Sequence, residues 1–231
     1  MTEKKLDVSI HYTMAVCGGI LGIYAIYNRT SVFGSAQTAN LIELVTDLIG
    51  GNVPEMLIRA GALAVYVGAI VLAVFLEKTV RFNLKYLAVV LELAVVAVLG
   101  FLPAQMNPIV ALYPVFFITA FQWSIFKGAK GYVSSTIFST NNLKQTVSAF
   151  TDYLLSGGEE TEARKKKGEK AIFFGGTLLS FHLGVAAGYV ASVAFGLQSV
   201  WLCIVPLSAG LIQLFLQDSL EAGVVAERKG A

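Results

Sequence analysis

The stretch SAQTANLIELV (35–45) recurs in altered form as IFSTNNLKQTV (137–147), and this pair decides how the rest of the sequence is interpreted. Each copy begins with small polar residues and continues as a short amphipathic stretch that ends at a glycine pair, which suits the end of a helix and a chain reversal. In the aligned copies Thr38 matches Thr140, Asn40 matches Asn142, and Leu41 matches Leu143. An internal repeat of this kind is typical of transporters.

Long apolar runs surround these two segments. The chain has 231 residues, of which 56% are hydrophobic and 14% are charged. Because about 20 helical residues cross the hydrocarbon core of a bilayer, six runs qualify as transmembrane helices: 11–28, 57–77, 83–102, 108–126, 171–196 and 199–217. We therefore expect an all-α, multi-pass integral membrane protein with no soluble domain. The N-terminal residues lack the cleavage pattern of a secretory signal, so we expect them to be retained.

The two polar segments, 31–50 and 131–156, are too mixed in composition to be placed by hydropathy. The positions of the basic residues instead distinguish re-entrant segments from full crossings. If both segments enter the membrane and return on the same side, almost every Lys and Arg lies on the cytoplasmic side, as short cytoplasmic loops require. Full crossings would instead place the cluster Lys78, Arg81 and Lys85 outside. We therefore predict two re-entrant half-helices in the cell (inner) membrane, with both termini in the cytoplasm.

Each half of the chain thus consists of a span, a re-entrant segment and two further spans. YVGAIV, from Tyr66, aligns with HLGVAA, from His182, which extends the repeat beyond the polar segments. Three crossings per half invert the second half, which gives a 3+3 inverted-topology repeat in a single membrane domain, 1–231. We place the repeats at about 11–102 and 108–217, with a charged cytoplasmic loop at 157–170, and expect the half-helix N-termini to meet near the bilayer midplane.

The sequence resembles the YoaK family of bacterial membrane proteins of unknown function at three short motifs. These are Thr38-Ala39-Asn40 after the first span, Gln122-Trp123 near the inner end of the fourth span, and Thr140-Asn141-Asn142 after it. The acidic residue that relatives carry in the first span is absent from GGILGIYAIYN (18–28). The resemblance covers nearly the whole chain and implies the membrane fold, but it implies no substrate.

The polar residues at the half-helix starts are the first candidates for a binding site. Ser, Thr and Asn commonly cap helices, so capping by itself would explain them. In an apolar medium, however, two facing helix starts also resemble known half-helix sites for ions and solutes. The candidates are Gln37, Thr38, Asn40, Thr140, Asn141 and Asn142.

Ionisable residues inside the predicted spans are the second group of candidates, since charges at that depth are costly. Glu92 lies at the centre of the third span and His182 near the centre of the fifth. A proton-coupled function would use Glu92 as the proton carrier. The alternative is that Glu92 is protonated and hydrogen-bonded between helices, while His182 is a neutral packing residue. Tyr66, the counterpart of His182 in the repeat, joins the candidates.

Two charged residues near the starts of the half-helices, Glu43 and Lys144, hold nearly equivalent repeat positions. A salt bridge between them would cross the midplane. A cation is unfavourable near a helix N-terminus, so Lys144 is expected to face an anion or a carboxylate. Gln122, in an otherwise apolar span, has two interpretations: it donates a hydrogen bond to the second re-entrant segment, or it bonds between spans.

Several functions are excluded or disfavoured. The net charge of +2 is too small to suggest nucleic-acid binding, and no nucleotide-binding or hydrolase motif occurs. Cys17 and Cys203 lack metal-ligand spacing, so we expect no metal site. Because the motifs named above do not occur, we also expect no cofactor and no enzymatic activity. An intramembrane enzyme would have to use Glu92 and His182 as its acid-base pair.

We therefore predict a transporter or channel for a small polar or anionic solute. The alternative is a non-transporting protein that binds a lipid, a cofactor or a partner subunit at the same site. Membrane lipid is an expected partner, and a homo-oligomer is left open.

Overall fold

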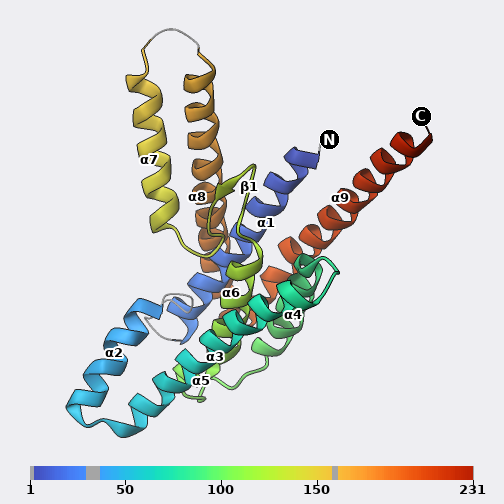
Figure 1. The fold of residues 1–231 in the computed structure, drawn as a ribbon. Coiled ribbons are helices and arrows are strands. Elements are labelled where there is room, and N and C mark those ends of the chain that lie inside the picture. The colour runs from blue at the N-terminus through green and yellow to red at the C-terminus, as the bar shows by residue number, and fades with distance from the viewer. Residues whose placement is uncertain (1–2, 30–36, 158–160, 231) are drawn as a thin grey trace.

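The computed structural model describes residues 3–29, 37–157 and 161–230, and these residues form helices joined by loops and one short hairpin (Figure 1). The N-terminal half contains α1 (Glu3–Ile23), the π-helix η1 (Tyr24–Arg29), α2 (Gln37–Gly50), α3 (Val53–Thr79) and α4 (Leu84–Leu99). The middle contains α5 (Pro108–Ala111), α6 (Tyr113–Ile125) and the strands β1 (Gly128–Ala129) and β2 (Tyr132–Val133). The remainder contains α7 (Thr140–Leu155), α8 (Glu162–Phe195), the 3-10 helix η2 (Gly196–Cys203) and α9 (Ile204–Gly230).

Three continuous helical segments of the described chain are long and apolar enough to cross a membrane. They are Lys5–Arg29, Val53–Thr79 and Glu162–Ala222. The last segment joins α8, η2 and α9, and the chain turns at Gly196, whose φ of +54° suits a residue without a side chain. Many large apolar side chains on α3 and α8 are exposed, including Phe75 and Val190. Lipid is the environment that suits such a surface.

Two of the expected crossings form shorter helices than the sequence suggested. The run at 83–102 gives α4, with 16 residues, and the run at 108–126 gives α6, with 13 residues. At 1.5 Å per residue these helices are about 24 Å and 20 Å long, which is less than the roughly 30 Å of hydrocarbon. Six complete crossings therefore stay a prediction.

The helix expected at 108–126 is divided because two prolines start new helical segments. Pro108 and Pro114 each occupy the first turn of a helix, α5 and α6 respectively, where the missing N–H group is tolerated. The Asn107 side chain accepts hydrogen bonds from the N–H groups of Ile109 and Val110 and so caps α5.

The charged stretch expected as a loop at 157–170 is mostly helical, which corrects that prediction. Thr161 accepts a hydrogen bond from the N–H of Arg164 through its hydroxyl, and α8 begins directly after it. The following Glu, Arg and Lys residues favour helix formation, which explains the extension. Residues 158–160, and residues 31–36 of the first expected re-entrant segment, lie outside the described part of the chain.

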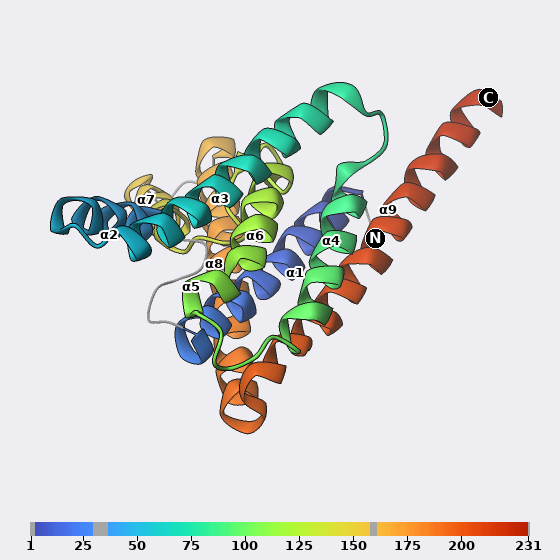
Figure 2. The ribbon, with the colours of Figure 1, turned by 90° about the horizontal axis from the view of Figure 1, so that it is seen from below.

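Most of the main contacts between helices join segments that are far apart in the sequence. α1 packs on α8 and α9, while α6 packs on α3 and α4. The short helix α2 packs on α3, and α7 packs on α8. α4 and α9 also contact each other. Figure 2 shows α4 beside α9, with α2 on the opposite side of the molecule.

Glycines allow α1 and α8 to approach closely. A Cβ atom placed on Gly19 would collide with the carbonyl oxygen of Phe181, and one on Gly184 would collide with that of Val16. Small residues at such positions let helix backbones approach in a membrane protein. The two helices therefore depend on glycine where they meet.

Replacement of Gly184 by Ala is expected to destabilise the protein by about 1–3 kcal/mol, because the added methyl group must displace the α1 backbone. Thermal unfolding of the purified protein in detergent measures the effect. Gly68→Ala is the matched control, since a Cβ at Gly68 on α3 meets nothing within 4 Å. Equal melting temperatures for the two variants would contradict the packing described here.

Candidate functional site

A cavity of about 690 Å³ lies where α2 and α7 begin. Figure 1 shows that the two helices run away from this region in different directions. Its lining comes from α2, α3, α6, α7 and the segment that precedes α7: Gln37, Thr38, Leu41, Tyr66, Trp123, Phe138, Thr140, Asn141 and Lys144. The cavity thus brings together six of the residues that the sequence singled out, from both copies of the repeat: Gln37, Thr38, Tyr66, Thr140, Asn141 and Lys144.

The cavity offers positive charge and hydrogen-bond donors. Within the described chain Lys144 has no acidic partner, and its side chain is exposed. Both polar atoms of the Gln37 side chain are buried without a hydrogen-bond partner among the described residues. The first N–H groups of a helix have no partner within the helix, and its N-terminus carries partial positive charge. This combination suits a small polar or anionic solute.

Glu43 does not pair with Lys144, so the salt bridge across the midplane that the sequence allowed does not form. Its carboxylate instead contacts the Arg59 guanidinium on α3. Asp47 accepts from the same guanidinium, with an Nε to Oδ2 distance of 2.8 Å. Asp47 and Glu43 lie one turn apart on α2, so one arginine on the packed neighbour helix contacts both.

The sequence suggested that Thr and Asn residues cap both α2 and α7. At α7 the structure shows a different arrangement. Its N-cap is Ser139 rather than Thr140, and the Ser139 side chain makes no capping bond. Asn142 is buried and donates to the carbonyl oxygens of Ser135 and Phe138, so it fixes the segment that leads into the helix. Asn40 is also buried, and its Nδ2 has no partner among the described residues, which exclude the segment before α2.

His11 is a buried polar residue that the sequence analysis missed. The Asn142 amide nitrogen is occupied by two carbonyls, so its Oδ1 must accept the proton of the Ser134 hydroxyl, at 2.9 Å. Ser134 Oγ then has only lone pairs to offer His11 Nε2, which lies 3.1 Å away and must donate. Neutral His11 therefore carries its proton on Nε2, and Nδ1 is a buried acceptor without a partner in the described chain. Its position within the predicted span 11–28 was the sequence feature that could have identified it as a candidate.

Gln122 combines both interactions considered from the sequence. Its amide nitrogen donates to the Met14 carbonyl oxygen on α1 and to the Thr136 hydroxyl in the segment before α7, each at 3.0 Å. The side chain is fully buried, and its oxygen has no partner among the described residues. Gln122 thus ties the α7 segment to α1 rather than lining the cavity.

Glu92 and His182 lie in different surroundings. The Glu92 carboxyl group is buried and has no hydrogen-bond partner among the described residues. His182 is exposed on α8, and its Nδ1 lies 2.8 Å from the Leu178 carbonyl oxygen. A carbonyl only accepts, so Nδ1 carries the proton and Nε2 is left as an acceptor.

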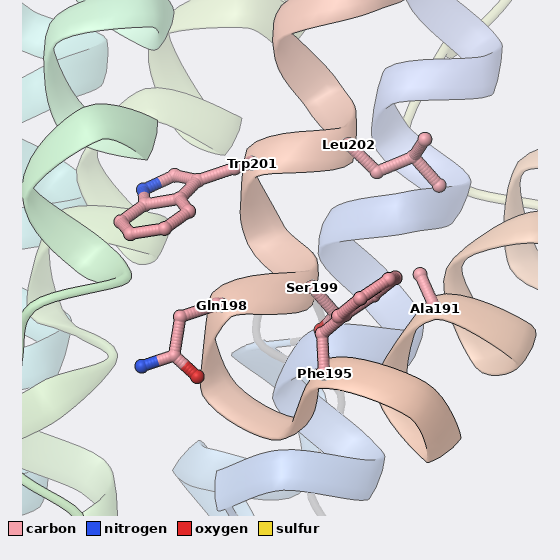
Figure 3. Close-up of a pocket in the computed structure, with 6 residues that line it drawn as sticks. All are labelled: Ala191, Phe195, Gln198, Ser199, Trp201 and Leu202. Carbon is pink, nitrogen blue, oxygen red and sulfur yellow. The ribbon is translucent and has the colours of Figure 1, made fainter.

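A second cavity, of about 600 Å³, lies at the junction of α8 and η2 (Figure 3). Figure 3 shows the Trp201 indole directed to one side, with Phe195 and Ala191 on the other. Gln198 donates to the Gly100 carbonyl oxygen, and the Ser199 hydroxyl bonds to Ser192. Its two polar side chains are therefore already engaged, so this cavity is a weaker site for a polar solute.

Replacement of Arg59 by Met should lower stability by about 1–3 kcal/mol, because Glu43 and Asp47 would be left as adjacent, unpaired carboxylates. Lys144→Met is the matched control and should change stability by less than about 0.5 kcal/mol, because Lys144 is exposed. Thermal unfolding of both variants provides the comparison. If adding Glu43→Gln and Asp47→Asn to Arg59→Met recovers no stability, the ion pairs are not the cause.

The chain belongs to the family described as "Protein of unknown function (DUF1275)", which matches residues 10–213. Comparisons with curated proteins and with solved structures gave no match.

Proposed function

We propose that this member of the family is a multi-pass membrane protein that moves a small polar or anionic solute through the cavity between the starts of α2 and α7. The observation that carries the proposal is the lining of that cavity. Thr38 and Thr140 lie about a hundred residues apart in the chain, hold equivalent positions in the repeat, and line the same space. Such convergence suits a shared binding site better than two separate helix caps.

The packing pattern supports an inverted repeat. If α1, α2, α3 and α4 are exchanged with α6, α7, α8 and α9, in that order, each main contact between these helices becomes another contact of the molecule or itself. The α1–α8 contact corresponds to α6–α3, α1–α9 corresponds to α6–α4, and α2–α3 corresponds to α7–α8. The α4–α9 contact corresponds to itself. We propose on this basis that α1, α3, α4, α5–α6, α8 and α9 are the six spans, and that α2 and α7 are re-entrant.

The chemistry of the cavity favours anions over cations. Lys144 contributes a full positive charge, and the two helix starts contribute backbone N–H groups and the positive ends of two helix dipoles. The Tyr66 hydroxyl adds a group that both donates and accepts. In apolar surroundings such interactions are stronger than in water, which helps to replace the hydration of the solute.

Removal of the Lys144 charge is the test of this proposal. Wild-type protein in liposomes is expected to carry at least one small anion from a panel of chloride, nitrate, formate, acetate and phosphate. Lys144→Met should reduce that flux about tenfold or more, because one charge-assisted contact is lost in the cavity. Flux is measured with ion-selective electrodes or radiolabelled anions.

Lys78→Met is the matched control, because Lys78 is an exposed lysine near the end of α3 and does not line the cavity. Its flux should equal that of the wild type. Equal anion flux in Lys144→Met and Lys78→Met would overturn the proposed pathway. Anion binding without any flux would instead support the non-transporting alternative.

A further inference from the structure

The hairpin of α7 and α8 carries two further cavities along its length. The first, of about 560 Å³, is lined by Ser139, Thr140, Leu143 and Thr146 on α7 and by Gly175, Leu178, Leu179 and His182 on α8. The second, of about 390 Å³, lies nearer the charged end of α8 and includes Phe150, Tyr153, Lys165, Gly168, Glu169 and Ile172. Figure 1 shows this end of the hairpin standing apart from the other helices, so its flanks are open.

The two cavities lie on the same flank of the hairpin. From the N-cap of α7 onward, the lining residues Ser139, Leu143, Thr146, Phe150 and Tyr153 follow one another at intervals of three or four. This spacing keeps them on one face of the helix. We name the combined feature the hairpin groove, defined by the residues of these two cavities. From Lys165 to His182 it follows α8 for about 25 Å at 1.5 Å per residue.

The middle of the hairpin groove is apolar and is made by small residues on α8. Gly168 and Gly175 leave room beside the Tyr153 ring and the Thr146 methyl group, and a Cβ at either position would only touch these groups. Exposed Leu143 and Phe150 on α7 provide the apolar wall. Such a surface suits an acyl chain.

One end of the hairpin groove is basic. Arg164 is already engaged, because its guanidinium stacks on the Tyr153 ring at 4.4 Å, and Lys167 donates to the Ser156 hydroxyl. Lys165, which lines the groove, and Lys166, which follows it on α8, are exposed and have no ion-pair partner within the described residues. Basic residues directly beside a membrane-crossing segment are typical of sites for acidic lipid headgroups.

We propose that the hairpin groove binds one anionic phospholipid, with its phosphate at Lys165 and Lys166 and an acyl chain extending past Gly175 toward His182. Glu169, which also lines the basic end, would accept from the hydroxyl groups of a glycerol headgroup. The length of the groove, its apolar middle and its charged end together match an amphiphile of this size. The proposal requires α8 to cross a bilayer, but it does not depend on solute transport.

Native mass spectrometry of the full-length protein with added phosphatidylglycerol, phosphatidylethanolamine or phosphatidylcholine tests the proposal. One phosphatidylglycerol should be retained in preference to phosphatidylcholine. Lys165→Gln combined with Lys166→Gln should weaken this retention about tenfold or more. The control pair, Lys78→Gln with Arg81→Gln, removes two exposed charges away from the groove and should leave the retention unchanged.

Filling the groove separates a bound lipid from general charge attraction. Gly175→Leu should abolish the retained phosphatidylglycerol, whereas Gly68→Leu, at an open position on α3, should not. Leu143→Trp fills the groove from α7 and gives a second variant if Gly175→Leu does not fold. Unchanged retention in a folded groove-filling variant, or equal retention of phosphatidylcholine, would overturn the proposal.

Discussion

The close contact of α1 with α8 is the constraint on which the rest of the structure depends. Gly19 and Gly184 bring the two backbones together, and Gly18 brings the carbonyl oxygen of Thr136 against α1 as well. One helix therefore holds both α8 and the segment that leads into α7. Because α7 packs back on α8, its start is fixed relative to α1 from two sides. The position of the candidate site thus follows from contacts that only glycine permits.

Hydrogen bonds also fix the position of the start of α7, in addition to the glycine contacts. A buried polar group without a partner costs roughly 1–3 kcal/mol, so polar side chains in an apolar interior are strongly driven to pair. The chain of hydrogen bonds from His11 Nε2 through the Ser134 hydroxyl to Asn142 pairs these atoms and fixes the direction of each bond. Gln122 adds a second connection at Thr136. The start of α7 is consequently held rigidly, which is what a site of fixed geometry requires.

The sequence predicted which segments are helical and apolar, and it identified most of the polar residues that share the cavity, because both follow from local patterns and from the repeat. Six crossings, the re-entrant geometry and the location of the termini stay predictions. The sequence alone did not identify the partner of Glu43, because charge pairing depends on which helix packs alongside, and Arg59 becomes its neighbour only when α2 packs on α3. His11 was missed for a related reason, since its partner lies more than a hundred residues away.

The charged residues on and around α2 differ from those on α7, and this difference bears on the proposed function. On the first half, Arg59 contacts two carboxylates, so the cluster of Glu43, Asp47 and Arg59 retains one net negative charge. On the second half, the repeat positions that match Glu43 and Asp47 are Gln145 and Ala149, and Lys144 is exposed in the cavity. An anion in the cavity is therefore attracted to the α7 side. Thr140 also lines the hairpin groove, so a lipid bound there and a solute in the cavity would both contact the start of α7.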